Sequence, residues 1–91
     1  MFVNHIVLNK YAVEFKDSTV RIFEAKTIED LCFSIADYFG FKTDLFKICM
    51  NGCKTCEEYI LITNEWLVNK SSFYDKIVKI YLINYILWEG K

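Results

Sequence analysis

A helical pattern of apolar positions lies in the first half of the chain. Thr27 precedes this pattern as a candidate N-cap, and Asp30 three residues later resembles a capping box with Asp in place of Glu. Gly40 follows the pattern, where a residue in the left-handed conformation commonly ends a helix. The sequence therefore predicts a helix over residues 27–40. Its apolar stripe, at spacings of three, four and seven, is Ile28, Leu31, Cys32, Ile35 and Phe39.

Alternating apolar and polar residues predict strands on both sides of this helix. Before it, residues 13–15 and 19–24 alternate around the turn-like residues 16–18, which predicts a β-hairpin. After it, residues 45–50 alternate and are followed by Asn51-Gly52, which predicts a third strand and a turn. Residues 1–8 are either a lengthened first strand or an added one.

The second half of the chain carries weaker signals. Residues 53–58 read as a polar loop, 59–63 as a short apolar run that could form a strand, and 64–74 as a mixed segment. Residues 77–87 predict the closing strand. We expect Val78, Ile80 and Leu82 on its inner face, and the outer face then consists of Ile77, Lys79, Tyr81, Ile83 and Tyr85.

These elements predict which residues form the core. Phe33 lies opposite the helix stripe, so we expect an exposed aromatic side chain there. The apolar faces of the helix and the strands should be buried together, and these residues are Ile22, Ile28, Leu31, Ile35, Phe39, Ile48, Met50, Val78 and Ile80.

The order of the elements, two strands, one helix and two or three further strands, predicts an α+β fold of the β-grasp type. We expect a mixed four- to five-stranded sheet packed on one main α-helix, in a single domain over residues 1–91. Residues 27–52 are similar to the central helix, strand and turn of ubiquitin, without a gap. The matching positions are Thr27, Ile28, Glu29, Ile35, Asp37, Gly40, Asp44 and Gly52.

The resemblance to ubiquitin-like proteins implies a non-catalytic domain that binds a protein partner, or a second copy of itself, through the outer face of its sheet. The mostly apolar outer set of the closing strand points the same way, because a face that meets only water should be polar. Cys49 and Lys47 stand where ubiquitin has an isoleucine and an arginine of its recognition patch, so standard ubiquitin receptors should not bind here. The candidate partner-binding residues are Lys47, Cys49, Lys79, Tyr81 and Ile83.

A first alternative is a conjugatable ubiquitin-like modifier. Some modifiers of this kind end in a single glycine that a protease uncovers. Gly90, with Lys91 removed, is the candidate conjugation residue.

A second alternative is a small zinc-binding interaction domain. Cys53 and Cys56 have the two-residue spacing of a zinc knuckle, but tetrahedral zinc needs four ligands and the chain has no second pair of this spacing. Cys32 belongs to the helix stripe and Cys49 to the predicted third strand, while His5 lies in an apolar stretch. We therefore expect reduced thiols, no metal and no cofactor.

Composition and charge narrow the function classes. The net charge of −1 gives no basic field, so nucleic acid is not an expected partner. The N-terminal residues lack a signal-peptide pattern, and the most apolar stretch, 77–88, is too short to span a bilayer, so we expect an intracellular protein, cytoplasmic or nuclear, without membrane contact. No catalytic triad or glycine-rich phosphate loop appears, so we expect no enzymatic activity.

Overall fold

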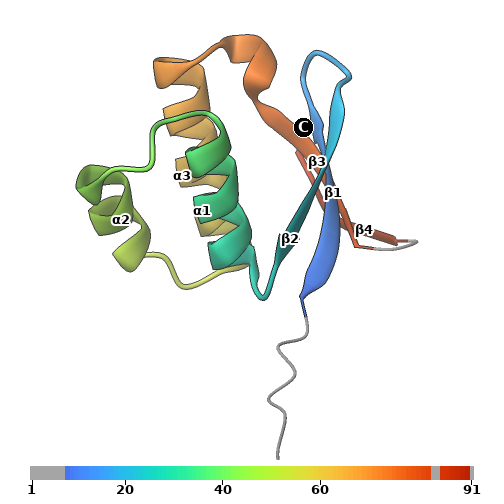
Figure 1. Cartoon of the computed structure of the whole chain (residues 1–91), viewed down its shortest axis with the longest axis horizontal. Coiled ribbons are helices and arrows are strands. Elements are labelled where there is room, and N and C mark those ends of the chain that lie inside the picture. Colours follow the sequence, from blue (N-terminus) through green and yellow to red (C-terminus); the bar gives the residue numbers. More distant parts are fainter. Residues whose placement is uncertain (1–7, 83–84, 91) are drawn as a thin grey trace, which may run out of the picture.

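The computed structural model describes residues 8–82 and 85–90, which form an α+β fold with one four-stranded antiparallel sheet (Figure 1). The order across the sheet is β2-β1-β3-β4, so that two hairpins meet along β1 and β3. The expected α+β class is confirmed, but the sheet is antiparallel rather than mixed. The strands are β1 (Asn9–Phe15), β2 (Val20–Ala25), β3 (Ile77–Leu82) and β4 (Tyr85–Glu89).

Three α-helices in the described residues, instead of one main helix, lie on the same side of the sheet (Figure 1). Each begins after a threonine whose hydroxyl accepts a hydrogen bond from the backbone N–H three residues later. These threonines are Thr27, Thr43 and Thr55. The helices are α1 (Ile28–Tyr38), α2 (Asp44–Asn51) and α3 (Cys56–Lys70), and a short 3₁₀ helix, η1 (Phe73–Asp75), leads into β3.

Helix α1 confirms the predicted first helix at both ends. Thr27 Oγ1 accepts from the Asp30 N–H at 3.1 Å. At the other end, the Gly40 N–H donates to Asp37 O at 3.1 Å and the Phe41 N–H to Ala36 O at 3.0 Å, while Gly40 has φ of 78°. This pair of bonds is a Schellman motif, which requires the left-handed conformation that glycine adopts at little cost.

The predicted third strand over residues 45–50 is wrong, because this segment is helix α2. Phe46 and Met50 are both buried, as predicted for Met50, and a separation of four suits either a strand face or a helix face. Ile48 distinguishes a strand from a helix here. In a strand it would lie on the same buried face as Phe46 and Met50, but it is 64 % exposed. The resemblance to ubiquitin's strand and turn therefore does not extend through this segment.

The predictions of a loop over 53–58 and a short strand over 59–63 are also wrong. Helix α3 runs from Cys56 to Lys70 and begins after Thr55, whose hydroxyl accepts the Glu58 N–H at 3.1 Å and donates to Glu58 Oε1 at 3.2 Å. Its buried positions are Ile60, Thr63, Asn64 and Leu67, at helical spacing.

The predicted closing strand over residues 77–87 is two strands, β3 and β4. Residues 83–84 lie outside the described residues. A register shift in the pairing of β1 with β3 sets Ile77 opposite Phe15, and both side chains are buried. Ile77 was expected on the outer face. The β-bulge moves the Ile77 side chain to the face beneath the helices, because one extra residue in a strand shifts the alternation of side chains between the two faces.

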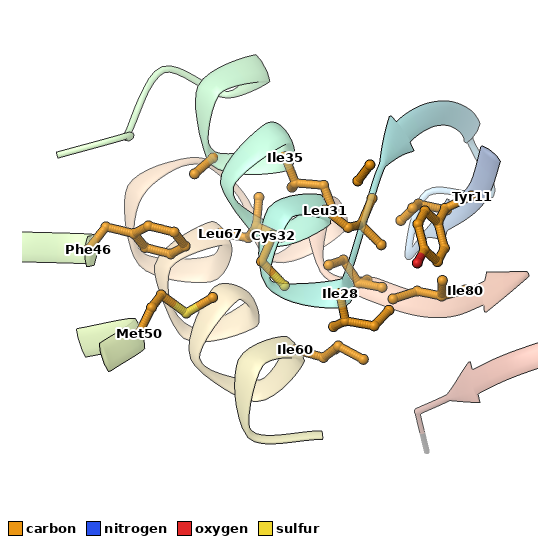
Figure 2. Packing of buried hydrophobic residues seen from close by; sticks show 14 of the residues in the cluster. Tyr11, Ile28, Leu31, Cys32, Ile35, Phe46, Met50, Ile60, Leu67 and Ile80 are labelled. Atoms are coloured by element: carbon orange, nitrogen blue, oxygen red, sulfur yellow. The ribbon is translucent and has the colours of Figure 1, made fainter. Parts of the chain in front are cut away.

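The core lies between the helices and the face of the sheet that they cover, and it continues between the helices themselves, where Phe46 and Met50 lie (Figure 2). It contains the predicted Ile28, Leu31, Ile35, Met50 and Ile80, while Phe39 and Val78 are partly buried. Its main unpredicted members are of two kinds. Phe46, Ile60 and Leu67 lie in helices that the sequence pattern assigned differently. Tyr11, Val13, Phe15 and Ile77 lie in strands, but the sequence did not place them in the core.

Two sequence predictions about individual exposures fail. Ile22 is 63 % exposed, because it lies on the face of β2 opposite Phe23, which packs against the core. Phe33 is partly buried rather than exposed, because its ring makes an edge contact with the Phe46 ring at a centroid distance of 5.7 Å. Helix α2, which was not expected, supplies that cover.

Candidate interaction surface

The open face of the sheet is the side away from the three helices (Figure 1). Along β1 the side chains alternate strictly, so Tyr11, Val13 and Phe15 are buried beneath the helices. Ala12 and Glu14, which lie between them, point to the open face and are only partly buried. The pairing of the strands then fixes which other residues share this face, because directly paired residues point the same way.

An apolar row crosses the open face from one edge of the sheet to the other. Ala12 pairs with Ile22 on one side and with Tyr81 on the other, and Tyr81 in turn pairs with Ile86. Ile22 is 63 % exposed and Ile86 is 47 % exposed. In order across the sheet, the apolar row is Ile22, Ala12, Tyr81 and Ile86.

A charged row runs beside the apolar row, one step along each strand. Glu14 pairs with Val20 and with Lys79, and Lys79 pairs with Glu89. Lys79 Nζ lies 3.3 Å from Glu89 Oε2, and hydrogen bonding to this carboxylate raises the pKa of Lys79 above its usual value. In order across the sheet, the charged row is Val20, Glu14, Lys79 and Glu89, of which Val20 is apolar and the other three are charged.

The two rows are joined by a hydrogen bond. The Tyr81 hydroxyl donates to Glu14 Oε1 at 3.4 Å, so the tyrosine ring lies across the boundary between the apolar and charged residues. On the far side of the apolar row, Lys10 pairs with Glu24. On β1, the apolar row is therefore flanked by a charged residue on each side, Lys10 and Glu14.

The structure brings together only some of the predicted partner-binding residues. Lys79 and Tyr81 lie on the open face, as expected. Lys47 and Cys49 are exposed on α2, in the helical layer, because the segment that carries them is not a strand. Ile83 lies outside the described residues.

Six residues of the two rows are not among the predicted partner-binding residues: Ala12, Glu14, Val20, Ile22, Ile86 and Glu89. A signal for the first two is present in β1, where Tyr11, Val13 and Phe15 alternate with smaller or polar residues. Ile22 was assigned to the core because its apolar character was read without the register of the hairpin. Pairing of β1 with β2 sets Val13 opposite Arg21, which leaves Ile22 on the other face.

A second exposed apolar pair lies on α2. Leu45 is 66 % exposed and Ile48 is 64 % exposed, three residues apart on the same side of the helix. The pair lies within one turn of one helix, whereas the apolar row crosses four strands, and exposed apolar residues are common on protein surfaces.

All four cysteines are free thiols. Cys32 is buried in the core, and burial raises its pKa to about 12. Cys53 is buried, whereas Cys49 and Cys56 are exposed. Within residues 8–82 and 85–90, no group of three or more His, Cys, Asp or Glu side chains is placed to hold a metal ion, and His5 lies outside these residues.

Gly90, the candidate conjugation residue, continues the pairing of the last two strands. Its backbone N–H donates to Val78 O at 2.9 Å. A modifier needs a flexible and accessible glycine, so this hydrogen bond does not favour the modifier alternative. Conjugation at Gly90 stays a prediction.

Comparisons of the chain with protein-family models, with curated proteins and with solved structures find no match. In the part of the chain that the structure describes, no helix is both long and apolar enough to cross a membrane.

Proposed function

We propose that this protein is a non-catalytic interaction domain that binds a protein partner through the open face of its sheet. The observation that carries this proposal is the apolar row, which crosses all four strands on the face without helices. An antiparallel sheet with one wet face normally alternates between apolar residues on its buried face and polar residues on the other. Ile22 and Ile86 depart from that pattern at opposite edges, and Tyr81 joins them across the centre.

Partial similarity to ubiquitin-like domains of the β-grasp type supports the same proposal. The first hairpin and α1 follow the order expected for such a domain, and the helix packs against one face of the sheet. The similarity stops after Gly40, where α2 and α3 replace the expected strand. Binding through the sheet face opposite the helix is common among ubiquitin-like domains, and the open face of this protein has the composition for it.

The substitution Tyr81→Glu tests this function. It places a charge in the middle of the apolar row, so it should abolish association with a partner while the side chain remains accessible to water in the free protein. Tyr74→Glu is the matched control, because Tyr74 is 63 % exposed on η1, outside both rows. Affinity capture with wild type and both variants, with circular dichroism of each, measures binding and folding separately.

The expected result is that wild type and Tyr74→Glu retain the same partner and Tyr81→Glu loses it, with all three folded. Unfolding of Tyr81→Glu alone would mean that Tyr81 acts as a core residue. Retention of the partner by a folded Tyr81→Glu variant would place the binding surface elsewhere. Either result contradicts the proposed function.

A further inference from the structure

We infer that the occupant of the open face is a second copy of this chain, in a symmetric dimer with the two open faces in contact. This inference rests on the proposed function and names the partner. It follows from the order of residues within the two rows. When a second copy of each row is turned end for end and placed against the first, the residues that face each other are complementary.

A two-fold axis parallel to the strands, passing between β1 and β3, would set β1 over β3 of the second copy and β2 over β4. The apolar rows of the two copies then run in opposite directions across the interface. Ala12, the smallest residue of the row, faces Tyr81, the largest, and Ile22 faces Ile86. Small residues opposite large ones allow two faces to interdigitate, which is how sheets pack at a separation of about 10 Å.

The charged row is also complementary under this axis. Glu14 of each copy faces Lys79 of the other, so both central contacts join opposite charges. Glu89 faces Val20 at the edges, where water remains within reach of the carboxylate. A contact of this kind is isologous, because the same patch serves both copies, and it closes at two subunits.

Because the sheets are twisted, the contacts between the central strands should contribute most to association. Two twisted sheets pack with their strands about 30° apart, so side chains stay in register near the axis and diverge toward the edges. Ala12, Glu14, Lys79 and Tyr81 belong to the central strands β1 and β3. Charge changes at Glu14 and Lys79 should therefore control association.

The test uses Glu14→Lys and Lys79→Glu, separately and in an equimolar mixture. Glu14→Lys gives a face with lysine at both central positions, and Lys79→Glu gives one with glutamate at both. Each variant then repels its own copy, but a mixed dimer contains two lysine–glutamate contacts. Sedimentation velocity with one variant fluorescently labelled reports the species formed, and circular dichroism confirms that each variant is folded.

We expect wild type to dimerise, each variant alone to dimerise roughly tenfold or more weakly, and the mixture to restore a mixed dimer. The mixture excludes an effect within one chain, because the contact between residues 14 and 79 of the same copy is lost in both variants. Glu14→Gln and Lys79→Gln are neutral controls. Each alone should weaken the dimer less than the charge reversal does, and their mixture regains one of the two lysine–glutamate contacts. They also provide the test if a charge reversal unfolds the protein.

Dimerisation of the single variants at wild-type strength, or a mixture that associates no better than its components, would overturn the inference. A wild type that stays monomeric at millimolar concentration would overturn it too. In that last case the proposed function is judged separately, since a different captured protein that Tyr81→Glu releases would support the open face as a binding surface for another partner.

Discussion

The covered face and the open face of the sheet are formed by the same four strands but have different roles. On the covered face, Tyr11, Val13 and Ile80 are almost wholly buried beneath the helices. On the open face, the apolar residues other than Val20 lie in one row, and charged residues border it. Burial on the covered face stabilises the fold. The open face carries apolar groups whose removal should affect association instead, so the comparison separates stability from binding.

The largest expected effect on the covered side is that of Leu31→Ala. Leu31 lies in α1, has no exposed surface and belongs to the core cluster, so the substitution should lower the free energy of unfolding by about 2–5 kcal/mol through lost burial and the cavity left behind. Leu61→Ala on α3 is the matched control, since Leu61 is 51 % exposed. Urea unfolding of both variants measures the difference, and equal losses would refute the assignment of the covered face.

Asn64→Leu should have an effect of similar size. The Asn64 side chain is buried and holds both backbone groups of Ile77, donating from Nδ2 to Ile77 O at 3.1 Å and accepting the Ile77 N–H at Oδ1 at 2.7 Å. Leucine leaves both groups unpaired, at a cost of about 1–3 kcal/mol for each buried group. Asn69→Leu, at an exposed position of the same helix, is the control for urea unfolding.

Thr27→Ala should destabilise the protein by about 1 kcal/mol. The substitution removes the hydroxyl that accepts the Asp30 N–H at the start of α1. Thr27→Ser keeps an oxygen acceptor and should restore most of the stability. Thermal unfolding of the three proteins compares them, and an alanine variant as stable as wild type would show that this cap contributes nothing.

The smallest effect on stability is expected on the open face. Ile22→Thr changes a side chain that is 63 % exposed in the free protein, so the free energy of unfolding should change by no more than about 0.5 kcal/mol. Its counterpart on the covered face, Ile80→Thr, places a hydroxyl in the core and should be far more disruptive. If urea unfolding at micromolar concentration shows similar losses for both, the two faces do not differ as described.

The elements that the sequence predicted well have their signals within a few residues. Thr27 and Gly40 mark the ends of α1, and the turn after Phe15 joins two alternating strands. Helix α2 was missed because the separation of Phe46 and Met50 fits both a strand and a helix. Helix α3 could have been found, since Thr55 and Glu58 have the spacing of a capping box and precede apolar residues at helical spacing.

The candidate surface was predicted only in part, because it depends on pairing between distant strands. Alternation alone placed Lys79 and Tyr81 on the outer face. Grouping Tyr81 with Ala12 and Ile86 requires the register of β3 against both neighbours. That register includes a bulge on each side of β3, and no local pattern in the sequence indicates where a bulge falls.

The central claim, that the protein associates through the open face, is tested most directly by following backbone amide chemical shifts of isotope-labelled protein while it is diluted from millimolar to micromolar concentration. We predict that the shifts of Ala12, Glu14, Ile22 and Tyr81 depend on concentration. The shifts of the exposed comparison residues on α2, Leu45 and Ile48, should stay constant. Changes that cluster on α2 instead, or shifts that do not depend on concentration at any residue, would contradict this account.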